Sequence, residues 1–280
     1  SQQRSDPRFR LACELVRNGR LGELTQVTTI LPAGPNRGAF EKKPVPGGLD
    51  WDFWQGQAPE HEYMPERVHL WFRYWLDYSG GTMTDWGAHH NDIALWGIGA
   101  NGPRTIEGKA TVDPVPGGFT APAEYAVEYT YANGVRHRCV STTADTIFGT
   151  EARPLKDGEL RTGVKFEGKD GWIYVTRGKI EASRPEVLSE PLGDAKKASL
   201  YESNDHMGNF FECIRTRKPP VCDAETGHRS VSVCHLGVLA IRLGRKLTWD
   251  PDTERFVDDK EADGCLAREM RKPWDYDLVK

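Results

Sequence analysis

A glycine-rich segment in the first third of the chain holds the densest group of side chains capable of acid–base chemistry. This segment, GGTMTDWGAHHND, runs from Gly80 to Asp92. Asp85 and His89 lie four residues apart at the expected start of a helix, a spacing that places both side chains on one face. A carboxylate next to an imidazole orients the ring and raises its pKa, as for a general base, whereas the positive helix N-terminus lowers that pKa. The alternative is structural, with Asp85 capping the helix and His89 at the protein surface.

The same segment offers two other types of chemistry, and the sequence favours neither. A metal would take its ligands from a group of four residues: Asp85, His89, His90 and Asp92. Consecutive helical side chains point about 100° apart, so His89 and His90 are badly placed to bind one ion, and we expect no metal site. A serine-type catalytic triad would need a nucleophile elbow motif, which the sequence lacks.

Aromatic residues are abundant, with nine tryptophans and nine tyrosines in the chain. Flat aromatic faces beside polar groups suit sugar rings, whose C–H faces stack on them. Six residues are candidates for sugar contacts, through aromatic faces or side-chain hydrogen bonds: Trp51, Trp54, Arg73, Tyr74, His90 and His206. The alternative for each tryptophan is a place in the hydrophobic core, and the alternative for His206 is a polar residue that opens a helix.

The elements that must position these residues follow from hydrophobic spacing. Helices are expected over residues 6–18, 69–78, 88–96, 205–215, 230–243 and 261–271. Strands are expected over residues 24–31, 106–112, 125–131, 135–140, 164–166 and 172–175. The pair Asn133-Gly134 predicts a tight hairpin turn between two of these strands. Strands and helices do not alternate, so the order predicts an α+β fold, with an antiparallel sheet and helices packed on one face.

Two stretches rich in glycine need separate interpretation. Residues 32–66 form a long loop with prolines, and its bulky residues Trp51 and Trp54 favour a functional loop over disorder. Residues 97–102 fit the GxGxxG pattern of dinucleotide-binding loops. A helix precedes this pattern and a strand follows it, whereas a pyrophosphate site needs the opposite order. We therefore expect the glycines of residues 97–102 to end a helix.

Composition excludes several classes of function. The net charge of −4 gives no reason to expect nucleic acid or an anionic membrane as a partner. No apolar run approaches the roughly 18–20 residues of a membrane helix. The six cysteines include no CxxC pair, so we expect free thiols rather than a zinc site. The chain as written begins with polar residues and no signal peptide, which favours the cytoplasm.

Several of these segments resemble one enzyme family. The stretch from Gly80 to His89 resembles the GGG-x-x-x-D-x-G-x-H motif of the Gfo/Idh/MocA oxidoreductases, the glucose–fructose oxidoreductase and inositol dehydrogenase family. Residues 2–5 and 15–22 are similar to the stretch that follows the family's nucleotide-binding domain. GLDWDFW at 48–54 and GRKLTWDP at 244–251 resemble a branch common in planctomycetes and related bacteria. The resemblance covers nearly the whole chain.

The resemblance implies an enzyme of two domains. A Rossmann domain binds NAD(P), and a second domain with a large, open-faced, mostly antiparallel sheet binds the substrate. Residues 1–280 match the second domain alone, because the glycine-rich loop, the ribose-binding acid and the lysine of the first domain have no counterpart here. Asp85 and His89 occupy the positions of the family residues beside the substrate hydroxyl, with His89 as the acid/base. No cofactor-binding residue is identified.

This likeness predicts hydride transfer between NAD(P) and a carbon of a sugar, glycoside or cyclitol in the intact enzyme. It also predicts homo-oligomers formed through the open sheet face, or association with a separate nucleotide-binding domain. Relatives in this branch often carry an export signal ahead of the Rossmann domain, which makes the periplasm the alternative location.

Two other functions fit a chain without a Rossmann domain. One is a cofactor-free carbohydrate lyase or hydrolase for keto-glycosides, which would need a second acid/base such as Glu62, Asp77 or His90 near Asp85 and His89. The other is a sugar-binding or assembly module without catalysis. Both catalytic hypotheses require Asp85 and His89 to face one cleft.

Overall fold

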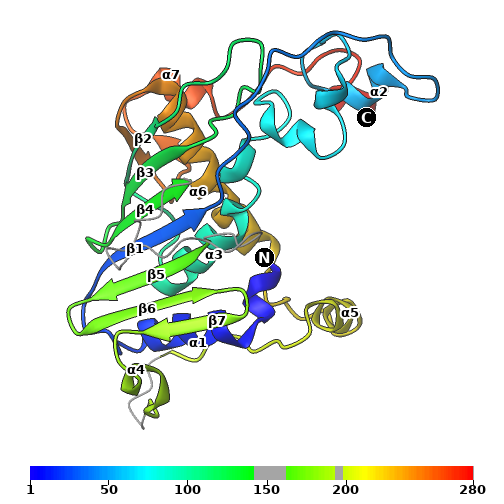
Figure 1. Ribbon diagram of the computed structural model, residues 1–280. Coiled ribbons are helices and arrows are strands. Elements are labelled where there is room, and N and C mark those ends of the chain that lie inside the picture. Colours follow the sequence, from blue (N-terminus) through cyan, green and yellow to red (C-terminus); the bar gives the residue numbers. More distant parts are fainter. Residues whose placement is uncertain (142–161, 193–197, 280) are drawn as a thin grey trace.

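One nine-stranded sheet organises the molecule (Figure 1). The computed structural model describes residues 1–141, 162–192 and 198–279. Within these ranges the strand order is β7-β6-β5-β1-β4-β3-β2-β8-β9. The strands are β1 (Leu24–Leu31), β2 (Thr105–Ala110), β3 (Tyr125–Thr130), β4 (Arg136–Ser141), β5 (Gly163–Gly168), β6 (Gly171–Thr176), β7 (Lys179–Ala182), β8 (Leu247–Asp250) and β9 (Arg255–Phe256).

Strand β1 is the fourth of the nine strands in this order, and it has one parallel and one antiparallel neighbour. It pairs in parallel with β4 and antiparallel with β5. Every other pair of neighbouring strands in the described sheet is antiparallel. The sheet is therefore mostly antiparallel, and the predicted α+β class is confirmed.

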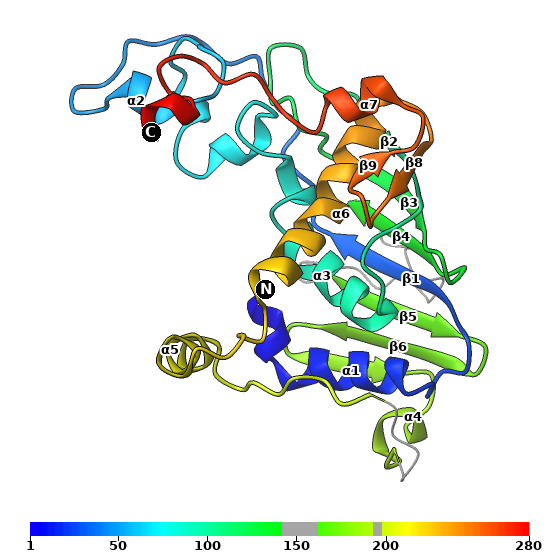
Figure 2. The same ribbon diagram turned by 180° about the vertical axis from the view of Figure 1, so that it is seen from behind.

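Three helices cover the same face of the sheet (Figures 1 and 2). They are α1, α3 and α6, which contact β6, β1 and β2 respectively. The helices are α1 (Pro7–Arg17), α2 (Trp51–Gln55), α3 (Gly87–Ile98), α4 (Glu186–Ser189), α5 (His206–Thr216), α6 (Ala224–Leu243) and α7 (Lys260–Gly264). None of these helices has the length and apolarity that a bilayer crossing requires.

The core lies between the sheet and the helices, and glycines let the two layers approach closely. A Cβ on Gly97 of α3 would lie 2.4 Å from Cε1 of Phe166 in β5. Tyr129 of β3 is fully buried, and its hydroxyl donates to the carbonyl of Val233 in α6 at 3.0 Å. Gly99 ends α3 with φ of 74°. The GxGxxG pattern thus ends a helix, as predicted, and Gly97 in addition allows a packing contact.

The outward side of the central strands carries charged residues in ion pairs. Glu128 of β3 meets Arg138 of β4 at 3.3 Å, and Lys165 of β5 meets Glu167 at 2.8 Å. Association of copies through this face stays a prediction. Any such contact would have to accommodate these polar side chains.

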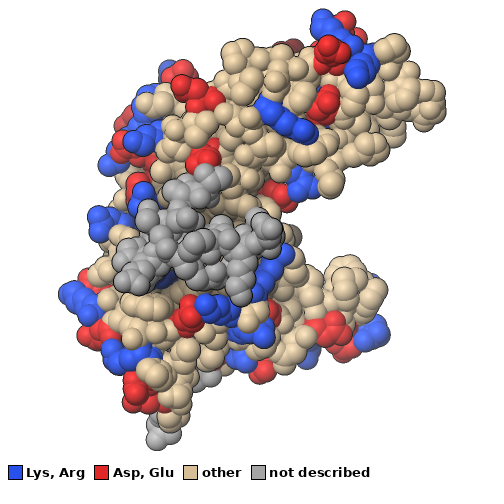
Figure 3. Space-filling model, in the orientation of Figure 1, with Lys and Arg blue, Asp and Glu red and all other residues tan. Residues whose placement is uncertain are grey.

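An arm extends from the end of β1, at the upper right of Figure 1. We define the arm as residues 32–80 and the tail as residues 264–279. The tail runs back along the arm, where Arg271 Nη1 donates to Asp52 Oδ1 at 2.5 Å and Trp274 Nε1 donates to Asp52 Oδ2 at 3.0 Å. Figure 3 shows a deep hollow between the arm and α5.

Some predicted elements differ from the structure. The predicted helix over 69–78 is only a 3₁₀ turn, Trp71–Tyr74, because His69 before it has a positive φ of 52° and Trp75 after it is extended. The predicted helix over 261–271 ends at Gly264, where the tail leaves for the arm. Helix α6 begins at Ala224, six residues before the predicted start, because Asp223 caps it by accepting from the Thr226 amide.

Candidate active site

The turn before α3 fixes the positions of the two predicted catalytic residues. Gly81 has φ of 67°, and a Cβ there would lie 2.8 Å from the Cβ of Ala121, so this position requires glycine. Helix α3 begins at Gly87 without a side-chain cap. Asp85 therefore precedes the helix, and the alternative in which it caps α3 is wrong. His89 lies in the first turn of α3.

An ion pair with the arm holds Asp85. Arg73 Nη1 donates to Asp85 Oδ2 at 2.6 Å, and the two side chains are 28% and 32% exposed. Arg73 belongs to the 3₁₀ turn Trp71–Tyr74, so the arm supplies this contact. The pair remains accessible, and a ligand hydroxyl could hydrogen-bond to both groups. The sequence predicted Arg73 as a sugar ligand but did not predict its pairing with Asp85.

His89 is half-buried, and its surroundings shift its pKa. Burial and the nearby Arg177 guanidinium lower the pKa of His89, although the Asp85 and Asp92 carboxylates act in the opposite direction. Its Nδ1 atom is buried and has no hydrogen-bond partner in the described structure. The ring is therefore neutral near neutral pH, the state in which an imidazole accepts a proton. A buried polar atom without a partner costs free energy, and such atoms occur at functional sites.

Two neighbours of His89 were missed at the sequence level. Arg177 lies in the turn between β6 and β7, with its guanidinium 4.7 Å from the centre of the Trp86 ring. Its Nε donates to Gln3 Oε1 at 3.3 Å, and Gln3 Nε2 donates to the His89 carbonyl at 3.4 Å. Only the order of strands brings Arg177 to α3, so no local sequence signal could have found it.

The other two predicted histidines do not join this site. His90 is fully buried, and burial lowers its pKa to about 3. It packs between Phe9 and Trp86, so the structure argues against contact with a substrate. His206 opens α5, and its Nδ1 lies 3.0 Å from the Ser5 hydroxyl. His206 is thus a polar residue that opens a helix, which was the structural alternative for it. Its hydrogen-bond partner is Ser5 and not His89.

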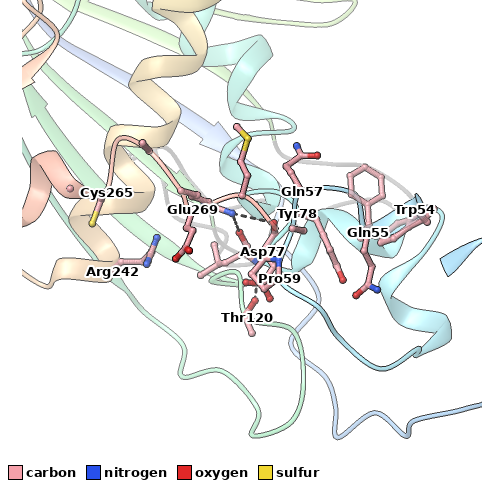
Figure 4. Close-up of a pocket in the computed structure, with 17 residues that line it drawn as sticks. Trp54, Gln55, Gln57, Pro59, Asp77, Tyr78, Thr120, Arg242, Cys265 and Glu269 are labelled. Atoms are coloured by element: carbon pink, nitrogen blue, oxygen red, sulfur yellow. Dashed lines mark hydrogen bonds between the residues drawn. The ribbon is translucent and has the colours of Figure 1, made fainter. Parts of the chain in front are cut away.

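The aromatic candidates lie in the arm, and the structure does not gather them around His89. Trp51 and Trp54 stack with centroids 5.0 Å apart, and Trp51 Nε1 donates to the His61 carbonyl. Tyr74 packs on Phe119 at 5.3 Å. The six candidates for sugar contacts therefore do not lie together in the structure. Trp54 lines a cavity of its own (Figure 4), and neither Asp85 nor His89 lines that cavity.

The residues suggested as a second acid/base have other partners. Glu62 forms an ion pair with Lys42, and Asp77 bonds to His61 Nε2 at 2.8 Å. His90 is buried, as described above. In the described ranges, no three His, Cys, Asp or Glu side chains gather as a metal site would need. Each of these three residues is therefore paired or buried in the described structure, which gives the lyase or hydrolase hypothesis no support from them.

Asp92 is a structural residue on the same helix. It is buried, and it accepts hydrogen bonds from Arg4 Nη2 at 2.7 Å and from the Ser230 hydroxyl at 2.6 Å. Burial acts to raise the pKa of Asp92, but the Arg4 guanidinium outweighs it and lowers the pKa. This ion pair ties the N-terminal turn, α3 and α6 together beneath His89.

Comparison with known proteins places this geometry in a family. Residues 34–146 and 157–276 match the sequence model of the oxidoreductase family's C-terminal alpha/beta domain. The chain belongs to the Gfo/Idh/MocA oxidoreductase family. No curated protein matches the chain.

Solved structures of other members share the fold of this chain. The WlbA dehydrogenase from Bordetella pertussis, in complex with NADH and UDP-GlcNAcA, superposes with a TM-score of 0.54 at 15% identity. The aldose–aldose oxidoreductase from Caulobacter crescentus, in complex with glycerol, gives 0.51 at 16% identity. The two matches each cover 88% of this chain, but only 61% and 62% of the respective solved chains. The protein thus spans about three fifths of the length of these Gfo/Idh/MocA structures.

Proposed function

We propose that this chain is the substrate-binding and catalytic part of an NAD(P)-dependent oxidoreductase that acts on a hydroxyl of a sugar, glycoside or cyclitol. The observation that carries the proposal is His89, a neutral imidazole with an unpartnered buried nitrogen, beside the ion pair of Asp85 and Arg73. Family membership supports oxidoreductase chemistry. The relatives with NADH, NAD or sugar ligands support the cofactor and substrate class.

The chain's own residues perform the proton half of the reaction. His89 accepts the proton of the substrate hydroxyl as the carbon–hydrogen bond breaks and the carbonyl forms. Asp85 and Arg73 hydrogen-bond to the same or a neighbouring hydroxyl and orient it toward His89. Arg177 favours the neutral form of His89 before the reaction. When bound, NAD(P) supplies the hydride acceptor, which no protein side chain can provide.

The proposal requires a surface on which the nucleotide-binding domain docks, and α5 offers one. Four apolar side chains at helical spacing are about half exposed: Met207, Phe210, Phe211 and Ile214. Helix α5 stands beside the hollow of Figure 3, and its first residue bonds to Ser5, close to Gln3 and His89. A hydride acceptor must reach this place, so we assign the apolar face of α5 to the nucleotide-binding domain, in the same polypeptide or as a separate subunit.

The test uses the intact enzyme, with this chain joined to its nucleotide-binding domain. Oxidation of aldoses, UDP-sugars and myo-inositol is followed with NAD⁺ and NADP⁺. We expect turnover of at least one of them, and a kcat lower by about 10²–10⁴-fold in His89→Ala. His69→Asn is the matched control, because His69 is an exposed histidine with positive φ that asparagine tolerates. Cofactor-independent conversion of 3-keto-glycosides by the chain alone would overturn the proposal.

A further inference from the structure

A groove separate from the Asp85–His89 pair crosses the base of the arm (Figure 4). Its larger part has a volume of about 980 Å³ and lies between α2, the end of α6 and the tail. A neighbouring cavity of about 440 Å³ lies against α6. Both cavities are lined by the same four residues: Tyr78, Arg242, Cys265 and Arg268. Because they share these walls, we treat the two as one elongated groove and call it the arm groove.

A rigid aromatic wall forms one side of the arm groove. Trp54 is stacked on Trp51 at an interplanar angle of 15° and meets the edge of Tyr78 at a centroid distance of 5.0 Å. Both Trp54 and Tyr78 line the groove. Rings that are already fixed by their neighbours lose little conformational freedom when a ligand stacks on them.

Polar groups also line the arm groove. Figure 4 shows Arg242, from the end of α6, and Glu269, from the tail, entering the groove. Both side chains are exposed, and within the described ranges neither forms an ion pair or hydrogen bond. The Gln57 amide also lines the groove. These groups supply hydrogen-bond donors and acceptors with opposite charges, a combination that suits hydroxyl groups rather than a strongly charged ligand.

The tail that covers the groove is anchored. Arg268 Nη1 donates to the carbonyls of Leu76 and Asp77 at 2.7 Å and 3.2 Å. The same stretch of the arm carries Arg73, whose side chain pairs with Asp85. One segment, residues 73–78, therefore contributes to both the candidate active site and the arm groove.

We propose that the arm groove binds a neutral oligosaccharide chain, with sugar rings on Trp54 and Tyr78 and hydroxyls on Arg242, Glu269 and Gln57. This inference rests on the proposed function for its substrate class and deepens it. It makes the substrate a glycoside or oligosaccharide whose remote sugar units are held by the arm, rather than a free monosaccharide.

The test measures binding of cellotetraose and laminaritetraose to the purified chain by calorimetry, with glucose and tetragalacturonic acid as comparisons. We expect a neutral tetrasaccharide to bind more tightly than glucose, and Trp54→Ala to weaken binding by about tenfold or more. Trp172→Phe, on the sheet outside the groove, is the matched control with unchanged affinity. Arg242→Gln and Glu269→Gln alter unpaired exposed side chains, so they weaken binding without loss of folding.

Three results would overturn the inference. They are no binding of either neutral tetrasaccharide by the folded chain, binding that is unchanged in all three groove variants, and tighter binding of tetragalacturonic acid than of the neutral chains. His89→Ala separates this inference from the proposed function. That variant should lose turnover in the intact enzyme and keep its tetrasaccharide affinity.

Discussion

The region beneath α3 and the arm are held together by different interactions. Beneath α3 the bonds are buried, as between Asp92 and Arg4 or between Tyr129 and α6. The arm is fixed by stacked rings and by exposed contacts such as Arg271 with Asp52. The difference indicates that the support of the proposed acid–base residue belongs to the buried core, whereas the arm keeps its own fixed rings and is joined to the tail by contacts at the surface.

Replacing the buried carboxylate should have the largest effect on stability. Asp92→Asn leaves the Arg4 guanidinium buried without its counter-ion, which we expect to lower the free energy of unfolding by about 3–5 kcal/mol. Asp85→Asn, in the accessible pair with Arg73, should change it by only about 0–1 kcal/mol. Urea unfolding of both variants makes the comparison. Equal losses would contradict the assignment of a buried and an accessible pair.

Asp92→Asn should also change how the stability of the protein depends on pH. The folded-state pKa of Asp92 is below its unfolded value, so its stabilising contribution is present above the unfolded pKa and is lost as pH falls through the folded pKa. Part of the acid sensitivity of the wild-type protein should therefore be missing in Asp92→Asn.

Close packing of α3 on the sheet should give the next largest effect. An added methyl group in Gly97→Ala would overlap the Phe166 ring, so we expect a loss of about 1–3 kcal/mol. Gly227→Ala in α6 is the control, because no atom lies within 4 Å of the added Cβ and alanine favours helix by about 1 kcal/mol. Thermal or urea unfolding of both variants measures these changes in stability. If Gly97→Ala stabilised the protein, α3 would not pack on Phe166 as closely as the structure shows.

Loss of a contact between the arm and the tail should affect these two segments and not the core. Arg271→Ala removes the ion pair of the tail with Asp52 and leaves the hydrogen bond from Trp274, and we expect faster proteolysis of the tail with a change of less than about 0.5 kcal/mol in global stability. Lys260→Ala, outside the arm and the tail, serves as a control for removing one positive charge. Loss of global stability in Arg271→Ala would mean that the arm and the core unfold as one unit.

The smallest effect on stability is expected at α5. Phe210 and Phe211 are half exposed, so Phe210→Ser with Phe211→Ser should leave the unfolding free energy of the isolated chain nearly unchanged. The same pair should reduce binding of a hydrophobic dye to the chain and weaken domain association in the intact enzyme. Unchanged activity and association there would contradict the docking role of α5.

Local patterns predicted much of the fold. Strand β1 was predicted over 24–31 and is observed as Leu24–Leu31, because this run of apolar and β-branched residues lies between Gly22 and Pro32. The start of α3 was placed within one residue, and the hairpin of β5 and β6 turns where the glycines indicated. Three features could not be predicted. Strand β7 is short, Arg177 reaches His89 only through the strand order, and the tail lies on the arm through contacts between distant residues.

The positions of Asp85 and His89 in the fold were predicted, and those of the candidates for sugar contacts were not. Asp85 and His89 followed from their types and spacing, and the structure places them together at the start of α3. The sugar contacts did not follow, because aromatic residues signal flat surfaces but not their location. Trp54 accordingly lies in the arm groove, and His90 lies in the core.

The most direct test of the central claim is the pH dependence of kcat/KM in the intact enzyme, measured for the wild type and His89→Ala. Burial and Arg177 lower the pKa of His89, so the wild-type rate should fall on the acid side with an apparent pKa below the ordinary histidine value of about 6.5. Arg177→Gln should move this limb to higher pH, and His89→Ala should remove it together with most of the activity. A His89→Ala enzyme with the wild-type rate and an unchanged acid limb would contradict His89 as the general base.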